Sequence, residues 1–409
     1  MRRVGPARWA ALLVVLAASL TGCGGGDGGD GPGALRFWHF YGPPDSATGG
    51  PLVKLIEKYE RAHPGVTVEV RHIPFGEFNR TLLQAAAGRE LPDVALIGAT
   101  ATQAMAEAGI ISDLTPRVTA WGKQAGFLPA SWNTTQVGGK TYGLPHVADS
   151  YAIYYNTDIF RRAGTEPPKT WAELGETARK LARDGRQGLA ISGIEGEEGA
   201  TALVIRLLAA GGDPAKVDTP QGRAALRHLK VMVDRGAVSK GMLGWNEEDV
   251  KNQFANGRAA MMINSATYVS TLRTENPDLK WDVALLPGDA RRTTFLAAEN
   301  LTITSGSARP DAAWDLLTWM QRPDVLAEYL PARNKLPART DVPDDGDEIR
   351  AVFREQLRSA WAPTGALARN STEVFTHIQG ALQAAVSGSV PVERALADAQ
   401  RKIDEALTR

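Results

Sequence analysis

The chain has 409 residues, with 46 basic and 46 acidic side chains that leave no net charge at pH 7. This balance gives no reason to expect a nucleic-acid partner, and six scattered histidines with one cysteine offer neither metal-ligand spacing nor an intrachain disulfide. About 375 residues follow a glycine-rich stretch, more than one hydrophobic core usually serves, so we expect two domains.

The N-terminus has the features of an export signal. Arginines at positions 2, 3 and 8 precede an uncharged apolar run from Trp9 to Leu20, which is too short to span a bilayer. The next stretch, Leu-Thr-Gly-Cys at 20–23, resembles a bacterial lipobox, which implies cleavage before Cys23 and lipidation of its thiol. An ordinary signal peptide with a chance cysteine is the alternative. The glycine-rich residues 24–33 predict a flexible tether.

Residues 35–108 alternate between strand and helix patterns. Apolar runs and alternation predict strands over 35–40, 66–70 and 92–97, and apolar residues at helical spacing predict helices over 52–62, 75–88 and 101–108. This β-α-β-α-β-α order predicts a mostly parallel sheet covered by helices on both faces.

The alternation resumes after residue 150. We expect strands at 151–155, 189–192 and 259–263, an extended stretch at 293–304, and helices over 200–210, 222–234 and 313–320. Thr170 and Glu173 form a capping-box pattern before a helix that ends near Leu181, and Asn246 with three acids marks another helix start. From Glu348 onward the pattern is mainly helical.

Nine stretches in order resemble the extracellular solute-binding proteins of bacterial ABC importers, in the carbohydrate-binding group that includes maltose- and glycerol-3-phosphate-binding proteins. They are FWHFYG (37–42), AHPGVTVEV (62–70), LPDVALI (91–97), AGIISDLTP (108–116), GKTYGLPHVADSYAIYYNTDIFRRAG (139–164), PPKTWAEL (167–174), FANGRAAMMI (254–263), ARPDAAWDLLTWM (308–320) and LPART (336–340).

The resemblance implies an α/β fold of two lobes, of the periplasmic-binding-protein type, joined by a hinge of several segments. We place the crossings near Tyr142–Ala148, Arg292–Ala298 and Pro337–Pro343. The expected organisation is a signal peptide (1–22), a lipidated cysteine and tether (23–33), a first lobe (34–145 and 297–340) and a second lobe (146–296 and 341–409).

A sugar presents hydroxyl groups and an apolar ring face, so its site needs planar polar groups beside aromatic rings. Loop and strand-end positions that combine these types are the predicted ligand-binding residues. They are His39, Tyr41, Asp149, Ser150, Trp245, Tyr268, Glu299, Asn300, Arg333 and Arg339.

Several of these residues also have structural interpretations. His39 can be a loop histidine with a local hydrogen bond, and Asp149, Glu299 and Arg339 can make structural hydrogen bonds at the hinge. Trp38 and Trp171 are expected in the core. For Trp245 we favour a binding role, because a tryptophan among glycines has little local core to join.

We therefore predict a lipid-anchored receptor on the extracytoplasmic face of the cell membrane. It captures a sugar or polyol and delivers it to a permease driven by an ATPase pair. We expect a monomer without cofactor, metal or catalytic residues. A receptor for glycerol 3-phosphate or a glycerophosphodiester, a secreted glycoside hydrolase and a structural or adhesive lipoprotein are the alternatives. Arg333 with Arg339 permits a phosphate ligand.

Overall fold

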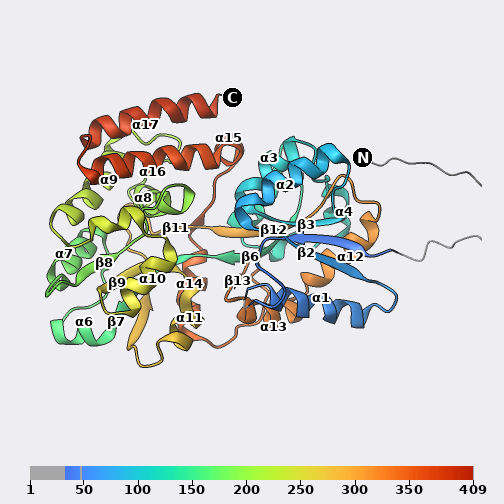
Figure 1. Ribbon diagram of the computed structural model, residues 1–409, viewed down its shortest axis with the longest axis horizontal. Helices are drawn as coiled ribbons and strands as arrows, with labels where there is room; N and C mark the ends of the chain where they lie inside the picture. The colour runs from blue at the N-terminus through green and yellow to red at the C-terminus, as the bar shows by residue number, and fades with distance from the viewer. Residues whose placement is uncertain (1–32, 47, 409) are drawn as a thin grey trace, which may run out of the picture. The chain divides into compact units, whose positions relative to one another are not determined.

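The computed structural model describes residues 33–46 and 48–408. The predicted signal peptide, Cys23 and nearly all of the tether lie outside these residues. Residues 34–409 form one compact unit of the chain, in which two sheets organise two lobes (Figure 1). The predicted two-lobed α/β fold is confirmed.

The first lobe is built on a six-stranded sheet in the order β13-β6-β12-β3-β1-β2. Its strands are β1 (Leu35–His39), β2 (Val68–His72), β3 (Val94–Gly98), β6 (Leu144–Asp149), β12 (Ala297–Ile303) and β13 (Leu336–Pro337). Its helices are α1 (Gly50–Ala62), α2 (Phe75–Gly88), α3 (Thr102–Glu107), α4 (Thr115–Trp121), α5 (Pro129–Asn133), α12 (Pro310–Met320) and α13 (Pro323–Arg333). Short 3-10 turns, η1 (Ala99–Ala101) and η2 (Gln124–Gly126), and the hairpin of β4 (Gln136–Val137) with β5 (Lys140–Thr141) complete it.

The second lobe is built on a four-stranded sheet in the order β10-β7-β9-β8. Its strands are β7 (Tyr151–Asn156), β8 (Gln187–Ala190), β9 (Ala259–Ser265) and β10 (Trp281–Ala284). The remaining helices are α6 (Thr157–Ala163), α7 (Trp171–Leu181), α8 (Glu197–Ala209), α9 (Pro220–Asp234), η3 (Lys240–Gly244), α10 (Glu247–Ala255), α11 (Tyr268–Glu275), α14 (Glu348–Leu357), α15 (Gly365–Arg369), α16 (Ser371–Ser387) and α17 (Val392–Leu407).

Both sheets are mixed, which corrects the prediction of mostly parallel sheets. The parallel pairs are β1 with β2, β1 with β3, and β8 with β9. β12, β6 and β13 pair antiparallel in the first sheet, as do β7 and its two neighbours in the second. A helical crossover within one lobe makes the strands that it joins parallel, whereas β12 and β13 enter the first sheet by other routes, and this rule does not constrain their direction.

Local sequence signals account for where several elements begin. Thr170 with Glu173 forms the predicted capping box of α7, and Asn246 with Asp249 forms a second one at α10. The predicted strand over 66–70 is displaced to 68–72, because the Val66 N–H bonds back to the His63 carbonyl in the preceding turn.

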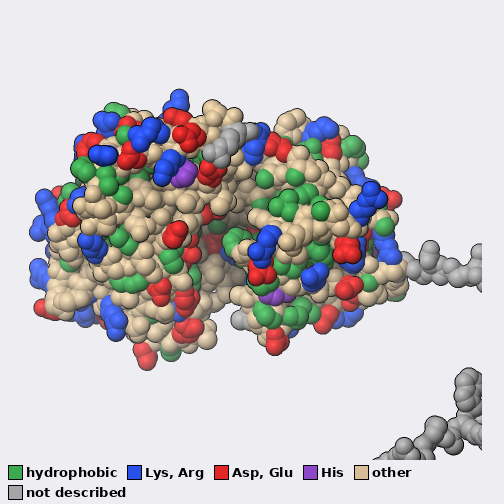
Figure 2. Space-filling model, turned by 45° about the horizontal axis from the view of Figure 1, so that its top comes forward, with side chains coloured by type: hydrophobic (Ala, Val, Ile, Leu, Met, Phe, Trp, Pro, Cys, Tyr) green, Lys and Arg blue, Asp and Glu red, His purple; other side chains and the backbone are tan. Residues whose placement is uncertain are grey.

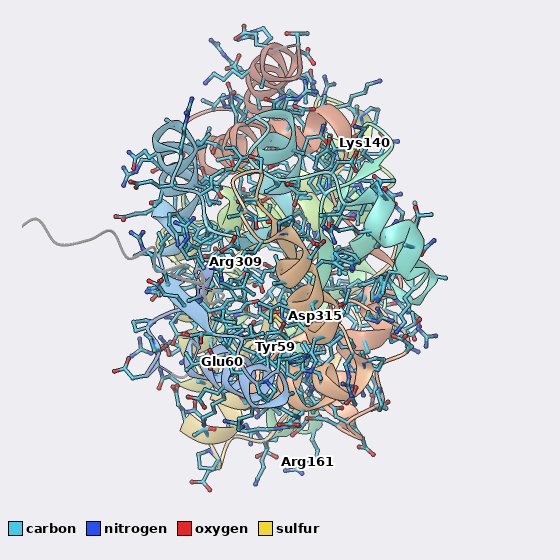
Figure 3. The ribbon with its side chains drawn as sticks, turned by 90° about the vertical axis from the view of Figure 1, so that its right-hand side faces the viewer. Tyr59, Glu60, Lys140, Arg161, Arg309 and Asp315 are labelled. Carbon is cyan, nitrogen blue, oxygen red and sulfur yellow. The ribbon has the colours of Figure 1, made fainter. Side chains whose placement is uncertain are left out.

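The cores of the two lobes contain the tryptophans that we expected to pack. Trp171 and Trp38 are both buried. In the first lobe the Tyr59 hydroxyl of α1 donates to Asp315 Oδ2 of α12 at 2.9 Å, and the two residues lie close together in Figure 3. Such packing makes each lobe a rigid support for side chains at the ends of its strands.

The chain changes from one sheet to the other at Ser150, which separates β6 from β7. This lies two residues after the predicted first crossing, because β6 remains paired with β12 as far as Asp149. The second change follows β11 (Thr294–Phe295), a strand paired with β14 (Ala360–Trp361). The Tyr151 N–H donates to Thr294 Oγ1 at 3.0 Å, so these two crossing segments are tied together. The lobe limits given above remain a prediction.

Among the described residues, none of the helices has the length and apolar character needed to cross a bilayer.

Candidate functional site

Three residues of the first lobe form one wall of the candidate site. Tyr41 follows the end of β1, Glu299 lies in β12 opposite Gly98 of β3, and Arg333 ends α13. The Tyr41 hydroxyl donates to Glu299 Oε2, and Arg333 Cζ lies 3.7 Å from the centroid of the Tyr41 ring. This pairing is a cation–π contact beside a charge-assisted hydrogen bond.

Burial and neighbouring charges fix the protonation of this wall. Burial raises the pKa of the Tyr41 hydroxyl, and the Glu299 carboxylate raises it further, so Tyr41 remains a hydrogen donor. Burial acts to lower the pKa of Arg333, but Tyr41, Tyr329 and Glu299 together hold it above its usual value. The first lobe therefore presents an aromatic ring, a fixed cation and a carboxylate.

The second lobe contributes a wall of carboxylates. Glu247 is the first residue of α10, and the Tyr151 hydroxyl donates to its Oε1 at 2.5 Å. The Glu247 N–H donates to Glu198 Oε1, which also accepts a hydrogen bond from Ser192 at 3.3 Å. Burial raises the pKa of Glu247 to about 7 despite the bond from Tyr151, and the charges of Glu198 and Asp149 add to the rise.

Asp149 and Lys335 join the two walls at the hinge. Asp149 accepts from the N–H groups of Ser150 and Ala266 at 2.8 and 2.9 Å, and from the Thr267 hydroxyl at 2.7 Å. Its Oδ2 also lies 3.2 Å from Lys335 Nζ. Burial acts to lower the pKa of Lys335, yet Asp149 and Glu299 raise it, so Lys335 is a second fixed cation.

We call these eight residues the inter-lobe site: Tyr41, Asp149, Tyr151, Glu198, Glu247, Glu299, Arg333 and Lys335. Figure 2 shows a hollow between the lobes, with acidic side chains on the side formed by the second lobe. Four of the eight are acids and two are bases. The site is therefore rich in hydrogen-bond acceptors.

Three other predicted residues adjoin this site. His39 is the last residue of β1 rather than part of a loop, and its Nδ1 accepts from the Tyr41 N–H at 3.2 Å. Burial lowers the pKa of His39 to about 4, so the ring is neutral and supports Tyr41. Tyr268 begins α11, and burial followed by the charge of Glu247 raises its pKa. Trp245 is half-buried two residues before Glu247, and its carbonyl accepts from Ser192 at 2.9 Å.

The structure places the remaining three predicted residues in structural contacts. Asn300 donates to Thr102 Oγ1 at 2.9 Å and Thr134 Oγ1 at 3.1 Å, since adjacent strand residues alternate faces and Glu299 takes the other face. Ser150 donates to the Phe353 carbonyl at 3.0 Å. Their ligand contacts, like those of the other predicted residues, remain predictions.

Arg339 and Arg333 have different interaction partners. Its guanidinium donates to both carboxylate oxygens of Asp341 and stacks 4.6 Å from the Phe127 centroid and 5.6 Å from that of Trp121. Arg333 instead contacts Tyr41 and the Thr48 carbonyl. These partners do not form the pair of converging arginines that a phosphate site would use.

Sequence reasoning missed four members of the site. They are Tyr151, Glu198, Glu247 and Lys335. Glu247 was interpreted only as an acid at a helix start, although Asn246 and Asp249 already complete the cap of α10. Glu247 is therefore an acid that the helix cap does not need, and this excess was the signal in the sequence that it could belong to a site. Lys335 follows the predicted Arg333 by two residues, but no pattern distinguishes it from a surface lysine.

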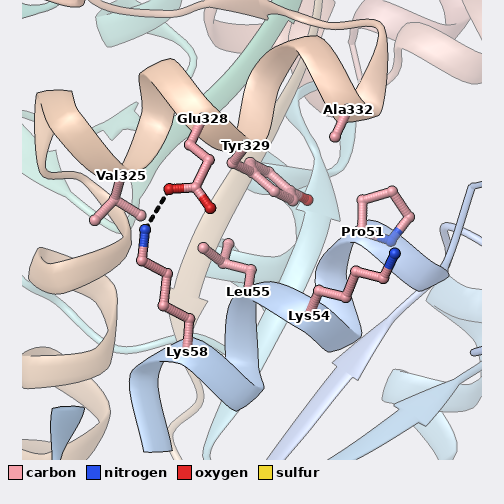
Figure 4. Close-up of a pocket in the computed structure, with 8 residues that line it drawn as sticks. All are labelled: Pro51, Lys54, Leu55, Lys58, Val325, Glu328, Tyr329 and Ala332. Carbon is pink, nitrogen blue, oxygen red and sulfur yellow. Dashed lines mark hydrogen bonds and ion pairs between the residues drawn. The ribbon is translucent and has the colours of Figure 1, made fainter. Parts of the chain in front are cut away.

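A second concavity lies between α1 and α13 of the first lobe (Figure 4). This groove of about 170 Å³ is lined by Leu55, Val325 and Tyr329, and Lys58 pairs with Glu328 at its edge. It is mainly apolar and contains residues of one lobe only. In residues 33–46 and 48–408, no three His, Cys, Asp or Glu side chains are placed to hold a metal ion.

Comparison with known proteins agrees with this architecture. The bacterial extracellular solute-binding protein family matches residues 43–327. An uncharacterised lipoprotein of Streptomyces antibioticus is 27% identical over 87% of this chain and 80% of its own length.

Two solved structures extend the comparison. An ABC-transporter solute-binding protein from Thermotoga lettingae, bound to α-D-tagatose, has a TM-score of 0.79 and 27% identity, covering 91% of this chain and 99% of its own. The GacH receptor of Streptomyces glaucescens, solved unliganded and with acarbose, has a TM-score of 0.79 and 25% identity, covering 92% and 98%. The family match spans more than half of the chain, and the protein is therefore a member of the bacterial extracellular solute-binding protein family.

Proposed function

We propose that this protein is the substrate-binding lipoprotein of an ABC importer and that it captures a sugar in the inter-lobe site. The observation that carries the proposal is the division of the site. One lobe supplies the Tyr41 ring and Arg333, and the other supplies the carboxylates of Glu198 and Glu247. A sugar has an apolar ring face, which suits the Tyr41 wall, and several hydroxyl groups, which can donate to the carboxylates of the other wall. One sugar ligand therefore matches both walls.

The charges of the site favour a neutral polyhydroxylated ligand over a phosphate ester. Four carboxylates and two cations surround the space, and Arg339 is bound to Asp341. A phosphate would meet net repulsion there, whereas sugar hydroxyls donate to carboxylates. The tagatose and acarbose ligands of the two similar receptors support the same ligand class.

Binding is coupled to closure because the two walls belong to different lobes. A sugar that touches only one wall makes half of the contacts, and a ligand shifts an open–closed equilibrium only by its difference in affinity for the two states. Tyr41 is held as a donor and Arg333 as a cation before the ligand arrives, so closure need not reorganise the first wall. We propose that the closed form then docks on the permease and releases its sugar unchanged.

The glycoside-hydrolase alternative would use the same carboxylates differently. It needs one acid that keeps its proton near neutral pH, and the pKa of about 7 at Glu247 meets that requirement. Family membership favours the receptor. A turnover assay separates the two functions.

The decisive experiment is a thermal-shift screen of the full chain in detergent against hexoses, pentoses, their oligosaccharides and glycerol 3-phosphate. A sugar at about 100 times its Kd should add roughly 2.7 kcal/mol of stability. Stabilisation by glycerol 3-phosphate alone, or consumption of a glycoside in the same samples, would overturn the proposal.

The lipid anchor is a separate part of the proposal. The lipobox-like residues 20–23 and the similar Streptomyces lipoprotein support acylation of Cys23. Mass spectrometry of the first mature peptide should find lipid on Cys23, and Cys23→Ala should release the protein from membranes. An unmodified Cys23 in a membrane-bound protein would contradict the anchor.

A further inference from the structure

Phe75, at the start of α2, has an unusual environment for an aromatic residue in this protein. Its side chain is 70% exposed. Every other aromatic side chain in residues 33–46 and 48–408 is buried or half-buried. An exposed apolar ring that stabilises no core is a candidate contact for a ligand or partner, although single exposed apolar residues are common. Exposure alone therefore does not identify Phe75 as a binding residue, but the residues around its ring do.

Aromatic contacts connect Phe75 to the inter-lobe site. The centroid of its ring lies 5.0 Å from that of Phe40, at an interplanar angle of 66°. Phe40 in turn lies 5.6 Å from Tyr41, at 75°. Tyr41 is buried, Phe40 half-buried and Phe75 exposed, so the three rings form a continuous strip from the site to the surface.

The strip follows one edge of the first sheet. His39 ends β1 opposite His72, which ends the parallel strand β2. Phe40 and Tyr41 follow the first of these ends, and Phe75 follows the second after Ile73 and Pro74. Ligands of open α/β sheets bind outside the carboxyl ends of the strands. Phe75 therefore extends the edge on which Tyr41 already lies.

Phe40, against which Phe75 packs, is itself held by the core of the first lobe. The ring centroid of Phe40 also lies 5.4 Å from that of Phe78, a buried residue of α2, the helix that Phe75 begins. Phe40 thus cannot turn away without disturbing the core of the first lobe. A rigid aromatic surface loses little conformational entropy when a ligand stacks on it.

We propose that Phe40 and Phe75 form an outer subsite for a further sugar ring, so that the ligand is an oligosaccharide rather than a monosaccharide. This inference rests on the proposed function and specifies its substrate class. Phe75 lies two ring contacts from Tyr41. The two steps between ring centroids are 5.6 and 5.0 Å, and in the proposed pose one sugar ring contacts the Tyr41–Glu299 pair while a second ring contacts Phe75. Stacking on the Phe75 face removes apolar surface of both partners from water.

The test compares ligand length against variants of Phe75 in the full chain. Mono-, di- and trisaccharides of glucose, mannose and arabinose are titrated by calorimetry into the wild type, Phe75→Ala and Phe75→Trp. Leu83→Ala is the matched control, because Leu83 is 50% exposed on the same helix. All four proteins should unfold alike, since the altered side chains lie on the surface.

We expect affinity in the wild type to rise from the mono- to the trisaccharide of at least one series. Phe75→Ala should weaken trisaccharide binding at least tenfold and leave the monosaccharide unchanged, while Phe75→Trp and Leu83→Ala should bind like the wild type. Equal affinities for all lengths, or an unchanged Phe75→Ala, would overturn the subsite while leaving sugar binding intact. If no saccharide binds any of the proteins, the proposed function falls together with this inference.

Discussion

The first lobe faces the inter-lobe site with an aromatic ring, a guanidinium and the carboxylate of Glu299, whereas the second lobe faces it with carboxylates and a tyrosine hydroxyl. Arg333 lies against Tyr41 in one wall, whereas Glu247 in the other lies beside the carboxylates of Glu198 and Asp149, and the charge of Lys335 offsets them only in part. Burial consequently raises the pKa of Glu247 to about 7, but Arg333 stays charged. The first wall therefore carries its own cation, whereas the second wall consists of carboxylates held by hydrogen bonds from Tyr151, Ser192 and the backbone.

Removing the cation of the first wall should have the largest effect. Arg333→Gln deletes a buried charge that contacts Tyr41 and the Thr48 carbonyl. We expect the free energy of unfolding to fall by about 3 kcal/mol, as for other disrupted buried charge networks, with loss of ligand affinity. Urea unfolding followed by tryptophan fluorescence measures the change. Arg162→Gln, at an exposed position of α6, is the control. An equal loss in both variants would remove the special role of Arg333.

Neutralising the second wall should stabilise the protein in alkaline solution. The folded pKa of Glu247 is about 7 and its ordinary value is 4.5. Between these values the unfolded chain ionises first, so stability falls as pH rises, by about 3 kcal/mol for a shift of this size. Glu247→Gln should not show this decrease in the free energy of unfolding with rising pH. It should therefore be more stable than the wild type at pH 8.

Unfolding of Glu247→Gln at pH 4.5, 6 and 8 checks this sign. Burial also raises the pKa of Glu197 to about 7. Glu197 is unchanged in the variant, so its own contribution to the loss of stability with rising pH remains. Glu195→Gln is the control, because Glu195 is exposed in the segment just before α8. If Glu247→Gln and the wild type lose the same stability between pH 4.5 and 8, Glu247 does not ionise as we infer.

Trp245 tests whether the second wall also supplies an aromatic surface. Its side chain packs partly against the cores of the second lobe and the hinge. Trp245→Ala should weaken sugar binding at least tenfold, about 1.4 kcal/mol, with the fold retained. Trp314→Ala, in a half-buried tryptophan of α12, should leave affinity unchanged. If calorimetry finds an unchanged affinity for Trp245→Ala, Trp245 does not contact the sugar, and the second wall is acidic without an aromatic contact from this residue.

The smallest effect should come from the contact between α15 and the first lobe. Arg369 Nη2 donates to Glu107 Oε1 at 2.8 Å, and both side chains are partly exposed. Such a solvent-exposed pair is screened by water and stabilises only weakly. Glu107→Gln should increase the radius of gyration of the unliganded protein in X-ray scattering. Glu355→Gln breaks the pair with Arg358 at the C-terminal end of α14 and should not change the radius of gyration. Identical scattering profiles would show that the pair does not hold the lobes together.

Much of the architecture was predictable because it depends on short-range patterns. The apolar spacing of residues 52–59 gave α1, and Thr170 with Glu173 gave the start of α7. The sheet directions were not predictable in the same way. β12 and β6 pair across 148 or more positions of sequence, and no local signal states their relative direction.

The site shows the same division. The aromatic and polar residues after the first strand indicated Tyr41, and the segment before β13 indicated Arg333. The sequence could not say that Tyr41 would meet Glu299, which is 258 positions away. It also could not separate Glu299 from its neighbour Asn300, whose amide bonds to Thr102 and Thr134 in the interior.

The family motifs, most of the order of helices and strands, and the export signal that we expect could be inferred from the amino-acid sequence, because each depends on neighbouring residues. Which polar groups converge became visible in the folded protein. Folding brought Glu247, Glu198 and Tyr151 together and left Arg339 with Asp341. Convergence depends on the pairing and packing of distant segments, and the resulting burial and charges set the pKa values on which binding depends.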